Sequence, residues 1–344
     1  MRVLSVIIAV VFNVVFTKAQ VTSPFNQKAV KASTGTYSFF VTGHLHGSSA
    51  NQSGYPAATL LANLETINAD SVAFIISTGD LFMDIRKNIP TYEKALFGKL
   101  TKPLFNAVGN HDLSGNIYEK KYGKTWFSFK VGSEKFIFLD TEINDGSIKG
   151  KQFEFFSNAL TTDIQTTKNI FIVSHRPVWT EGDDKLENIF AGNTRSDFGN
   201  NFRYDIAPLL KTASKSCPIY WFSGSLGGNA PASFFYYKKE KNITYIQSAI
   251  RDLPRDGMLK VNVVDGQISF ETISLTGKKM PGLEECGLNF WKTIPAESFN
   301  YRLIPLYTKQ MLFHRYFWYG AAYAFAVVLL YYAVRKRLKR KKSA

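Results

Sequence analysis

Polar residues that could bind a metal ion follow four predicted strands, each at the point where the strand ends. The strands are short, mostly apolar runs that cover residues 37–42, 72–77, 103–108 and 169–174. The polar residues that follow them are His44, His46, Asp80, Asn110, His111, Asp112 and His175. In an open α/β sheet, the loops beyond the carboxyl ends of the strands gather in one place. We therefore expect these side chains to converge on a single site.

The residue types at these strand ends indicate which ions the site prefers. Imidazole nitrogen, carboxylate oxygen and amide oxygen form a mixed donor set, which suits Zn, Fe or Mn better than Ca or Mg. A single motif such as Gly79-Asp80 is typical of an ordinary turn. However, four of the five histidines of the chain lie at these strand ends. Together the motifs indicate a transition-metal site.

The hydrophobic pattern of the rest of the chain predicts the helices and strands that position these loops. Helical periodicity predicts helices over residues 57–68, 151–160 and 204–212. Further strands are predicted over residues 126–131, 135–140, 219–223, 234–238, 243–249, 259–264 and 267–274. The order of strand, loop, helix and strand predicts an α/β core, and the later hairpins predict a second sheet packed on the first.

The ordered motifs resemble those of the calcineurin-like metallophosphoesterases, a family that includes the purple acid phosphatases. Its motifs are D-x-H, G-D, G-N-H-[DE], a strand-end His and G-H-x-H. Gly79-Asp80 and residues 109–112 (GNHD) match outright, and His175 falls where the fourth motif belongs. The resemblance covers about residues 37–274. It implies an α/β, four-layer α-β-β-α sandwich of two mixed sheets, and a two-metal centre that hydrolyses phosphate monoesters or diesters.

The resemblance also implies a metal-binding role for individual residues. Asp80 would bridge two ions, His46 would bind the first, and Asn110 and His175 would bind the second. Paired ions in such a centre activate water, polarise the phosphoryl oxygen and stabilise both ends of an in-line displacement.

The same resemblance implies catalytic roles within the third motif. His111 would be the acid or charge stabiliser beside the leaving oxygen, and Asp112 would orient it. The purple acid phosphatases place an iron-ligating tyrosine where this sequence has Met83. We therefore expect no tyrosinate–iron chromophore.

Three positions depart from the pattern of the family. His44 stands where the first motif has its Asp, and Ser225 and Gly227 stand where the fifth motif has its two histidines. Two dications about 4 Å apart repel strongly, and the one bridging carboxylate that remains, Asp80, neutralises little of that charge. We therefore predict one tightly held ion, Zn, Mn or Fe, rather than two.

Two ligand sets for this ion remain open. His44, His46 and Asp80 form a set of two histidines and one carboxylate with open coordination positions. Asp80, Asn110 and His175 form the alternative set.

The net charge of +15 is concentrated near the chain ends. The last thirty residues, from Arg315, hold eight basic and no acidic residues, and Arg2 and Lys18 lie in the first nineteen. The rest holds 32 basic against 27 acidic residues. This distribution argues for membrane orientation and against a nucleic-acid partner.

The N-terminal residues are typical of an exported protein. Residues 1–19 are expected to form a signal peptide, with Arg2 before an apolar run and small residues near residue 19. Residues 20–36 would be a linker. Cys217 and Cys286 fit an exported protein with at most one disulfide, and form neither a disulfide scaffold nor a cysteine metal site.

The C-terminal residues are typical of a membrane anchor. Residues 275–315 have weak periodicity and would be a juxtamembrane stalk. Residues 316–334 are uncharged and predict one transmembrane helix about 28 Å long. The basic tail, residues 335–344, would be cytoplasmic and would hold the body outside the cytoplasm. We expect the periplasmic face of a bacterial inner membrane, with the lumenal face of the ER membrane as the alternative.

Two functions fit these residues. The preferred interpretation is a membrane-anchored, extracytoplasmic, metal-dependent phosphoester hydrolase, a phosphatase or phosphodiesterase, because His111 and Asp112 remain. The alternative is a catalytically reduced pseudophosphatase that acts as an anchored binding or scaffold module, because the fifth motif is lost. Arg176 could hold a substrate phosphate but is interpreted as a surface arginine.

Overall fold

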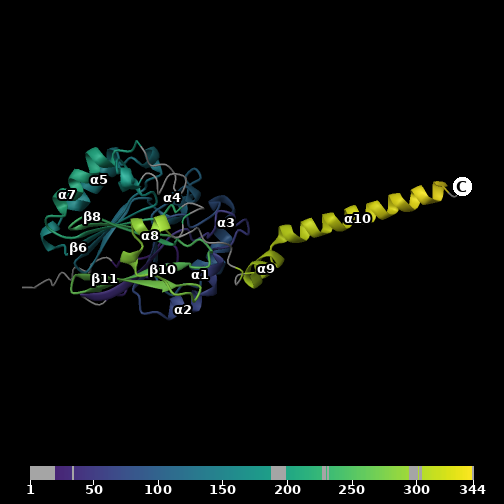
Figure 1. Cartoon of the computed structure of the whole chain (residues 1–344), viewed down its shortest axis with the longest axis horizontal. Coiled ribbons are helices and arrows are strands. Elements are labelled where there is room, and N and C mark those ends of the chain that lie inside the picture. Colours follow the sequence, from purple (N-terminus) through teal and green to yellow (C-terminus); the bar gives the residue numbers. More distant parts are fainter. Residues whose placement is uncertain are drawn as a thin grey trace, which may run out of the picture.

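A computed structural model describes residues 20–32, 35–186, 199–226, 230, 232–293, 301 and 304–342. The signal peptide expected over residues 1–19 and the position of Gly227 lie outside the described residues. The body consists of two β-sheets face to face, with helices against both outer faces (Figure 1). The four-layer architecture predicted from the sequence is therefore confirmed.

The first sheet has the strand order β11-β10-β1-β2-β3. Its strands are β1 (Thr36–Thr42), β2 (Phe74–Ser77), β3 (Leu104–Asn106), β10 (Gly257–Val264) and β11 (Gln267–Ser274). Strands β1, β2 and β3 are parallel to one another, and β10 and β11 add an antiparallel edge. Because β1, β2 and β3 are parallel, the loops after them leave the sheet at the same edge.

The second sheet has the strand order β4-β5-β6-β7-β9-β8. Its strands are β4 (Phe127–Val131), β5 (Glu134–Phe138), β6 (Asn169–Ser174), β7 (Ile219–Ser223), β8 (Phe234–Glu240) and β9 (Ile243–Ser248). Strands β5, β6, β7 and β9 are parallel, and β4 and β5 form the predicted hairpin. All five residues of β5 are buried, because one face packs on the first sheet and the other on helix α5.

Aromatic side chains fill the space between the two sheets. The ring of Phe39 on β1 lies edge-to-face against Phe136 on β5 and Phe171 on β6, with centroids 5.3 and 5.2 Å away. Such pairs contribute about 0.5–1.5 kcal/mol each beyond the area that they bury. This packing fixes the two sheets against each other and so brings their loop-bearing edges together.

Helices cover the outer faces of both sheets. These are α1 (Ala58–Ala62), α2 (Leu64–Ala69), α3 (Ile85–Tyr92) and α4 (Ile117–Tyr122) on the first sheet, and α5 (Gly150–Thr161) and α7 (Ala207–Ala213) on the second. Shorter helical turns cover Glu93–Phe97, Asn110–Asp112, Ile143–Gly146, Ile164–Thr166, Val178–Thr180, Phe202–Ile206 and Leu283–Glu285. The single helix predicted over residues 57–68 breaks at Asn63, whose Nδ2 donates to the carbonyl groups of Thr59 and Leu275.

The segment after β11 packs against the body. Trp291, on α8 (Leu288–Thr293), is buried and donates from Nε1 to the carbonyl of Phe234 at 2.8 Å. Cys286 is also buried; it and Cys217 are free thiols in separate core clusters. The residues up to 293 therefore belong to the packed body, although a stalk was expected from residue 275.

Two helices follow, α9 (Ile304–Leu312) and α10 (Arg315–Lys342). Helix α9 lies beside α1, whereas α10 extends away from the body (Figure 1). The part Arg315–Leu338 is long and apolar enough to cross a membrane, and none of its most apolar window is buried within the protein. The helix is longer at both ends than the predicted residues 316–334.

We expect Trp291→Ala to lower the free energy of unfolding of the full chain by about 3–5 kcal/mol, because it removes a large buried side chain from the core. Urea denaturation in detergent, followed by circular dichroism, measures this change. Asn289→Ala is the matched control, because Asn289 is an exposed residue of the same helix. Equal stability of the two variants would contradict the assignment of α8 to the packed body.

Candidate metal centre

The predicted site residues lie on loops at the carboxyl ends of four strands. His44 and His46 follow β1, Asp80 follows β2, Asn110, His111 and Asp112 follow β3, and His175 follows β6. The two sheets present these edges to each other, so the four loops meet where the sheets face one another. The convergence expected from the sequence is therefore present.

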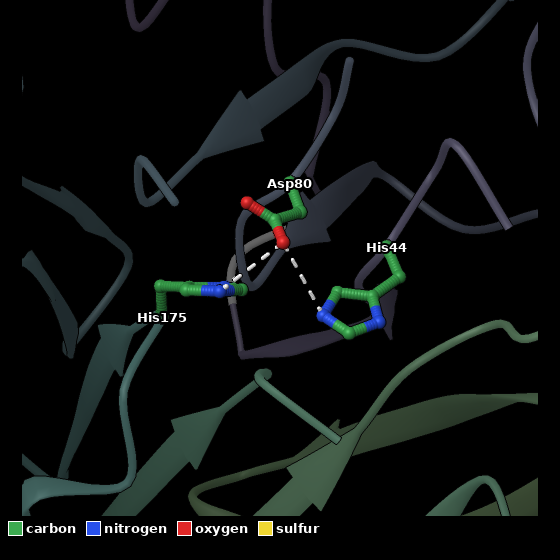
Figure 2. A group of neighbouring side chains, drawn as sticks. All are labelled: His44, Asp80 and His175. Atoms are coloured by element: carbon green, nitrogen blue, oxygen red, sulfur yellow. Dashed lines mark ion pairs between the residues drawn. The ribbon is translucent and has the colours of Figure 1, made fainter. Parts of the chain in front are cut away.

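The carboxylate of Asp80 lies at the centre of this cluster. Its Oδ2 lies 3.5 Å from Nε2 of His44, 3.6 Å from Nε2 of His46 and 3.4 Å from Nε2 of His175. Figure 2 shows the carboxylate between the imidazoles of His44 and His175, which reach it from different loops. All four residues are buried.

The loops reach this arrangement through uncommon backbone conformations. His44 and Asp80 both adopt the left-handed region, with φ of 49° and 56°. Such conformations cost about 1–3 kcal/mol each for residues other than glycine and persist where the surrounding structure imposes them. Here the amide of His44 donates to the carbonyl of Gly79 at 2.9 Å, so the two loops constrain each other.

The motif glycines allow the loops to approach closely. A Cβ on Gly109 would lie 2.2 Å from Oδ1 of Asp80, and a Cβ on Gly79 would lie 2.4 Å from Nδ1 of His175. Atoms without a bond between them do not approach to these distances. The glycines of the second and third motifs are therefore required by the position of Asp80 and His175.

Backbone carbonyls orient two of the imidazoles. Nδ1 of His175 donates to the carbonyl of Thr78 at 2.9 Å, and Nδ1 of His111 donates to the carbonyl of Met83 at 2.8 Å. Since a carbonyl only accepts, Nδ1 carries the proton in each ring. Nε2 of the neutral ring is then the nitrogen available to a metal ion, and a histidine that binds a metal usually donates its other ring N–H in this way.

The donors present fit a metal ion. Among the described residues, neither ring nitrogen of the buried His46 has a hydrogen-bond partner, which is costly for a polar group unless something binds it. His44, Asp80 and His175 form one group whose ligand atoms lie within 4.8 Å of one another, and His46, Asp80 and His111 form a second. Nitrogen and carboxylate donors of this kind suit Zn, Mn or Fe.

The grouping separates two members of the first ligand set predicted from the sequence. His44 and His46 fall into different groups, which share only Asp80. His111, which was expected to act as an acid, lies among the candidate ligands of the second group. Asn110 is half-buried at the start of the turn that carries His111, and its metal contact stays a prediction.

Asp112 contacts backbone groups of two loops. Its Oδ1 accepts from the amide of Phe82 at 3.1 Å, and its Oδ2 accepts from the amide of Gly109 at 3.0 Å. The expected hydrogen bond to His111 is not among the contacts of Asp112 in the described part of the chain. The carbonyl of Met83 contacts Nδ1 of His111, whereas Asp112 joins the second and third motif loops, and the orienting role of Asp112 stays a prediction.

Burial and mutual charge determine the protonation of the cluster. Burial alone would lower the pKa of His175, but the Asp80 carboxylate raises it to about 9. Burial favours the neutral form of Asp80, yet His175 and then the other imidazoles hold its pKa well below the usual range. Burial is also the main reason that the pKa of His44 lies well below 6.5. Without a metal ion, the site holds a charged Asp80–His175 pair and a neutral His44.

Two buried arginines flank the site. Arg251 follows β9, as the histidines follow their strands, and its Nη1 donates to the carbonyl of Ala230. Arg251 was not among the residues expected at the site, although it too follows the end of a strand. Arg176 is buried and forms a two-pronged ion pair with Glu142 at 2.9 and 2.7 Å, so its interpretation as a surface arginine is wrong.

The loop after β7 has a left-handed backbone residue, as the loops of His44 and Asp80 do. Ser225, which stands where the fifth motif has a histidine, is buried and has φ of 56°. The amide of Gly224 donates to the carbonyl of His175 at 3.0 Å. The loop is therefore held against the cluster, but Ser225 offers a hydroxyl where the family has an imidazole.

Comparison with known families identifies the class of protein to which this fold and site belong. The calcineurin-like phosphoesterase family matches residues 30–207, which is more than half of the chain. The chain belongs to this family, whose members hydrolyse phosphate esters. No curated protein matches the chain.

Two solved structures are similar to the chain. One is GAP50, described as the anchor in the inner membrane complex of Plasmodium, with a TM-score of 0.50 and 15% identity, over 71% of this chain and 86% of that chain. The other is purple acid phosphatase PPD1 from yellow lupin (Lupinus luteus) seeds, with a TM-score of 0.49 and 13% identity, over 74% of this chain and 54% of that chain. At these identities the likeness concerns the fold alone.

In the metal-free protein, we expect the free energy of unfolding to fall as the pH rises from 6.5 to about 9. Over this range folded His175 keeps a proton that the unfolded chain has lost, so the slope approaches about 1.4 kcal/mol per pH unit. Below pH 6.5 both states hold the proton and the stabilisation is fully present. Urea denaturation with a chelator across this range measures it. His175→Gln should flatten the slope, and an unchanged slope in that variant would refute the assignment.

Proposed function

We propose that the protein is a membrane-anchored, metal-dependent phosphoester hydrolase whose body lies outside the cytoplasm. The observation that carries this proposal is the convergence of three imidazole nitrogens within 3.4–3.6 Å of one buried carboxylate oxygen of Asp80. Burying these groups together costs stability, and a bound cation would offset that cost for the side chains that hold it.

The metal would be held by His44, Asp80 and His175, whose ligand atoms lie within 4.8 Å of one another. We keep the prediction of one ion, Zn, Mn or Fe, because the second group has no carboxylate apart from Asp80. When bound, such an ion supplies Lewis-acid polarisation of a phosphoryl oxygen and activation of the attacking water.

Residues of the chain would perform the remaining steps. His111, held by the carbonyl of Met83 through Nδ1, presents Nε2 to the site. In its protonated form Nε2 donates to the leaving oxygen, which is the role that the family resemblance implies. The buried guanidinium of Arg251 supplies positive charge for a substrate phosphate.

An anchored binding module is the alternative function. Its specific support is Ser225, which replaces a histidine on a loop that otherwise keeps the geometry of the site. The Plasmodium structure with the same fold is itself described as an anchor. In this case the fold would present a surface and the cluster would bind metal weakly or not at all.

We expect the purified full chain to contain one equivalent of Zn, Mn or Fe and to hydrolyse aryl phosphate esters. Asp80→Asn should lower kcat/KM by more than about a hundredfold, because it removes the shared carboxylate. Elemental analysis and steady-state kinetics in detergent measure both. Asp265→Asn is the matched control, because Asp265 lies at the opposite end of the first sheet, in the turn between β10 and β11.

Each outcome of this experiment selects one function. Two equivalents of metal would contradict the single ion and leave the hydrolase. Absence of metal, together with turnover no greater than that of Asp80→Asn, would refute the hydrolase and favour the binding module.

We propose that α10 crosses the membrane once, with its basic end in the cytoplasm. Arg335, Lys336 and Arg337 directly follow the uncharged residues 316–334 of this helix, and such residues stay on the cytoplasmic side. The proposed membrane is the bacterial inner membrane, with the ER membrane as the alternative. In both, the body lies on the side away from the cytoplasm.

Protease added to the cytoplasmic side of sealed membranes should therefore remove only the tail of the protein. Immunoblotting against an epitope in the body measures its protection. Membranes permeabilised with detergent are the control, in which the body should be digested as well. Digestion of the body in sealed membranes would reverse the proposed orientation.

A further inference from the structure

A cavity of about 720 Å³ lies between the body and the juxtamembrane helices. Its walls come from the loop 48–53, the loop 251–253, helix α9 and the first turn of α10. Most of the surface that lines the cavity is apolar, and the residues that matter most to its chemistry are Asn51, Arg251, the adjacent carboxylate Asp252, Leu253, Met311 and Phe317. Small-molecule sites of proteins have similar volumes, about 300–1,000 Å³.

One side of this cavity borders the candidate metal centre. Asn51 lines the cavity and donates from Nδ2 to the carbonyl of His46 at 2.7 Å. Arg251 lines it as well, on the loop that follows β9. The loop after β1 therefore carries His44 and His46 and also forms part of the cavity wall.

The opposite side borders the membrane. Met311 is on α9, and Phe317 is in the first turn of α10, the helix that crosses the bilayer in the proposed topology. Figure 1 shows α9 next to the body at the point where α10 leaves it. An apolar cavity at this level is within reach of the acyl chains of membrane lipids.

We propose that this cavity binds the apolar tail of a membrane lipid that carries a phosphate monoester, and that its phosphate extends past Arg251 to the metal centre. The proposal rests on the proposed function and names its substrate class. The cavity joins a cationic group at one end to an apolar lining that reaches the membrane helix. A lipid phosphate is complementary to this cavity, because its dianionic headgroup suits the arginine and its acyl chain suits the apolar lining.

The reaction needs only water as a second reactant. The oxygen of water forms a bond to phosphorus, and the bond between phosphorus and the lipid oxygen breaks. The leaving oxygen takes a proton, and the products are the lipid alcohol and inorganic phosphate. No oxidant, reductant or further group is required.

Photo-crosslinking tests binding without depending on turnover. The full chain is placed in phosphatidylcholine nanodiscs that contain a small fraction of phosphatidic acid with a photoreactive group on its acyl chain. We expect labelled peptides from residues 251–253 and 308–317. Unlabelled phosphatidic acid should compete for the label, whereas diacylglycerol with the same chains should not.

A pair of neighbouring residues provides matched variants. Met311 lines the cavity and is 46% exposed, whereas Leu312 is 42% exposed and does not line it. Met311→Asn should weaken competition by phosphatidic acid about tenfold, because it replaces apolar contact with a polar group. Leu312→Asn should leave it unchanged. The ratio of kcat/KM for phosphatidic acid to that for an aryl phosphate should fall only in the Met311 variant.

The outcomes separate this inference from the proposed function. Label outside these peptides, or equal competition by diacylglycerol, would overturn the lipid-phosphate site even if aryl phosphates are hydrolysed. Specific label that Met311→Asn reduces would support the site even if the purified protein lacks metal and turnover. Equal effects of the two variants would refute the role of the cavity.

Discussion

The structure of the site depends on one carboxylate that several imidazoles share in a buried place. Asp80 is taken out of water, which disfavours its charge, and His44, His46 and His175 surround it at 3.4–3.6 Å. The rest of the fold serves this arrangement. Parallel strands bring the loops to one edge, aromatic packing holds the two sheets together, and the absence of a side chain at Gly109 leaves room for the carboxylate.

Much of the fold and of the site could be predicted from local pattern. Short apolar strands followed by Gly79-Asp80 or by residues 109–112 predict metal-binding side chains at the strand ends. The structure brings these loops together. The hairpin of β4 and β5 was equally readable. These features depend on residue types within a few positions of one another, which is the range over which sequence pattern is informative.

The features that could not be predicted depend on contacts between distant segments. The helix predicted over residues 57–68 breaks at Asn63, whose side-chain amide donates to the carbonyl of Leu275, more than two hundred residues later. The segment around Trp291 has no clear periodicity. It packs on the body because the indole of Trp291 is buried in the core and its Nε1 donates to the carbonyl of Phe234. Arg251 was missed for a different reason, since arginine was not among the residue types sought at strand ends.

The hydrogen bond of Asn51 has a consequence for covalent modification. Asn51-Gln52-Ser53 is an acceptor sequence for N-linked sugar, and such acceptors are normally on the surface. Here the amide nitrogen that would carry the sugar is buried and donates to the carbonyls of His46 and Tyr55. In a cell that attaches such sugars, modification at Asn51 and the folded loop exclude each other, so the mature protein is expected to carry no glycan there.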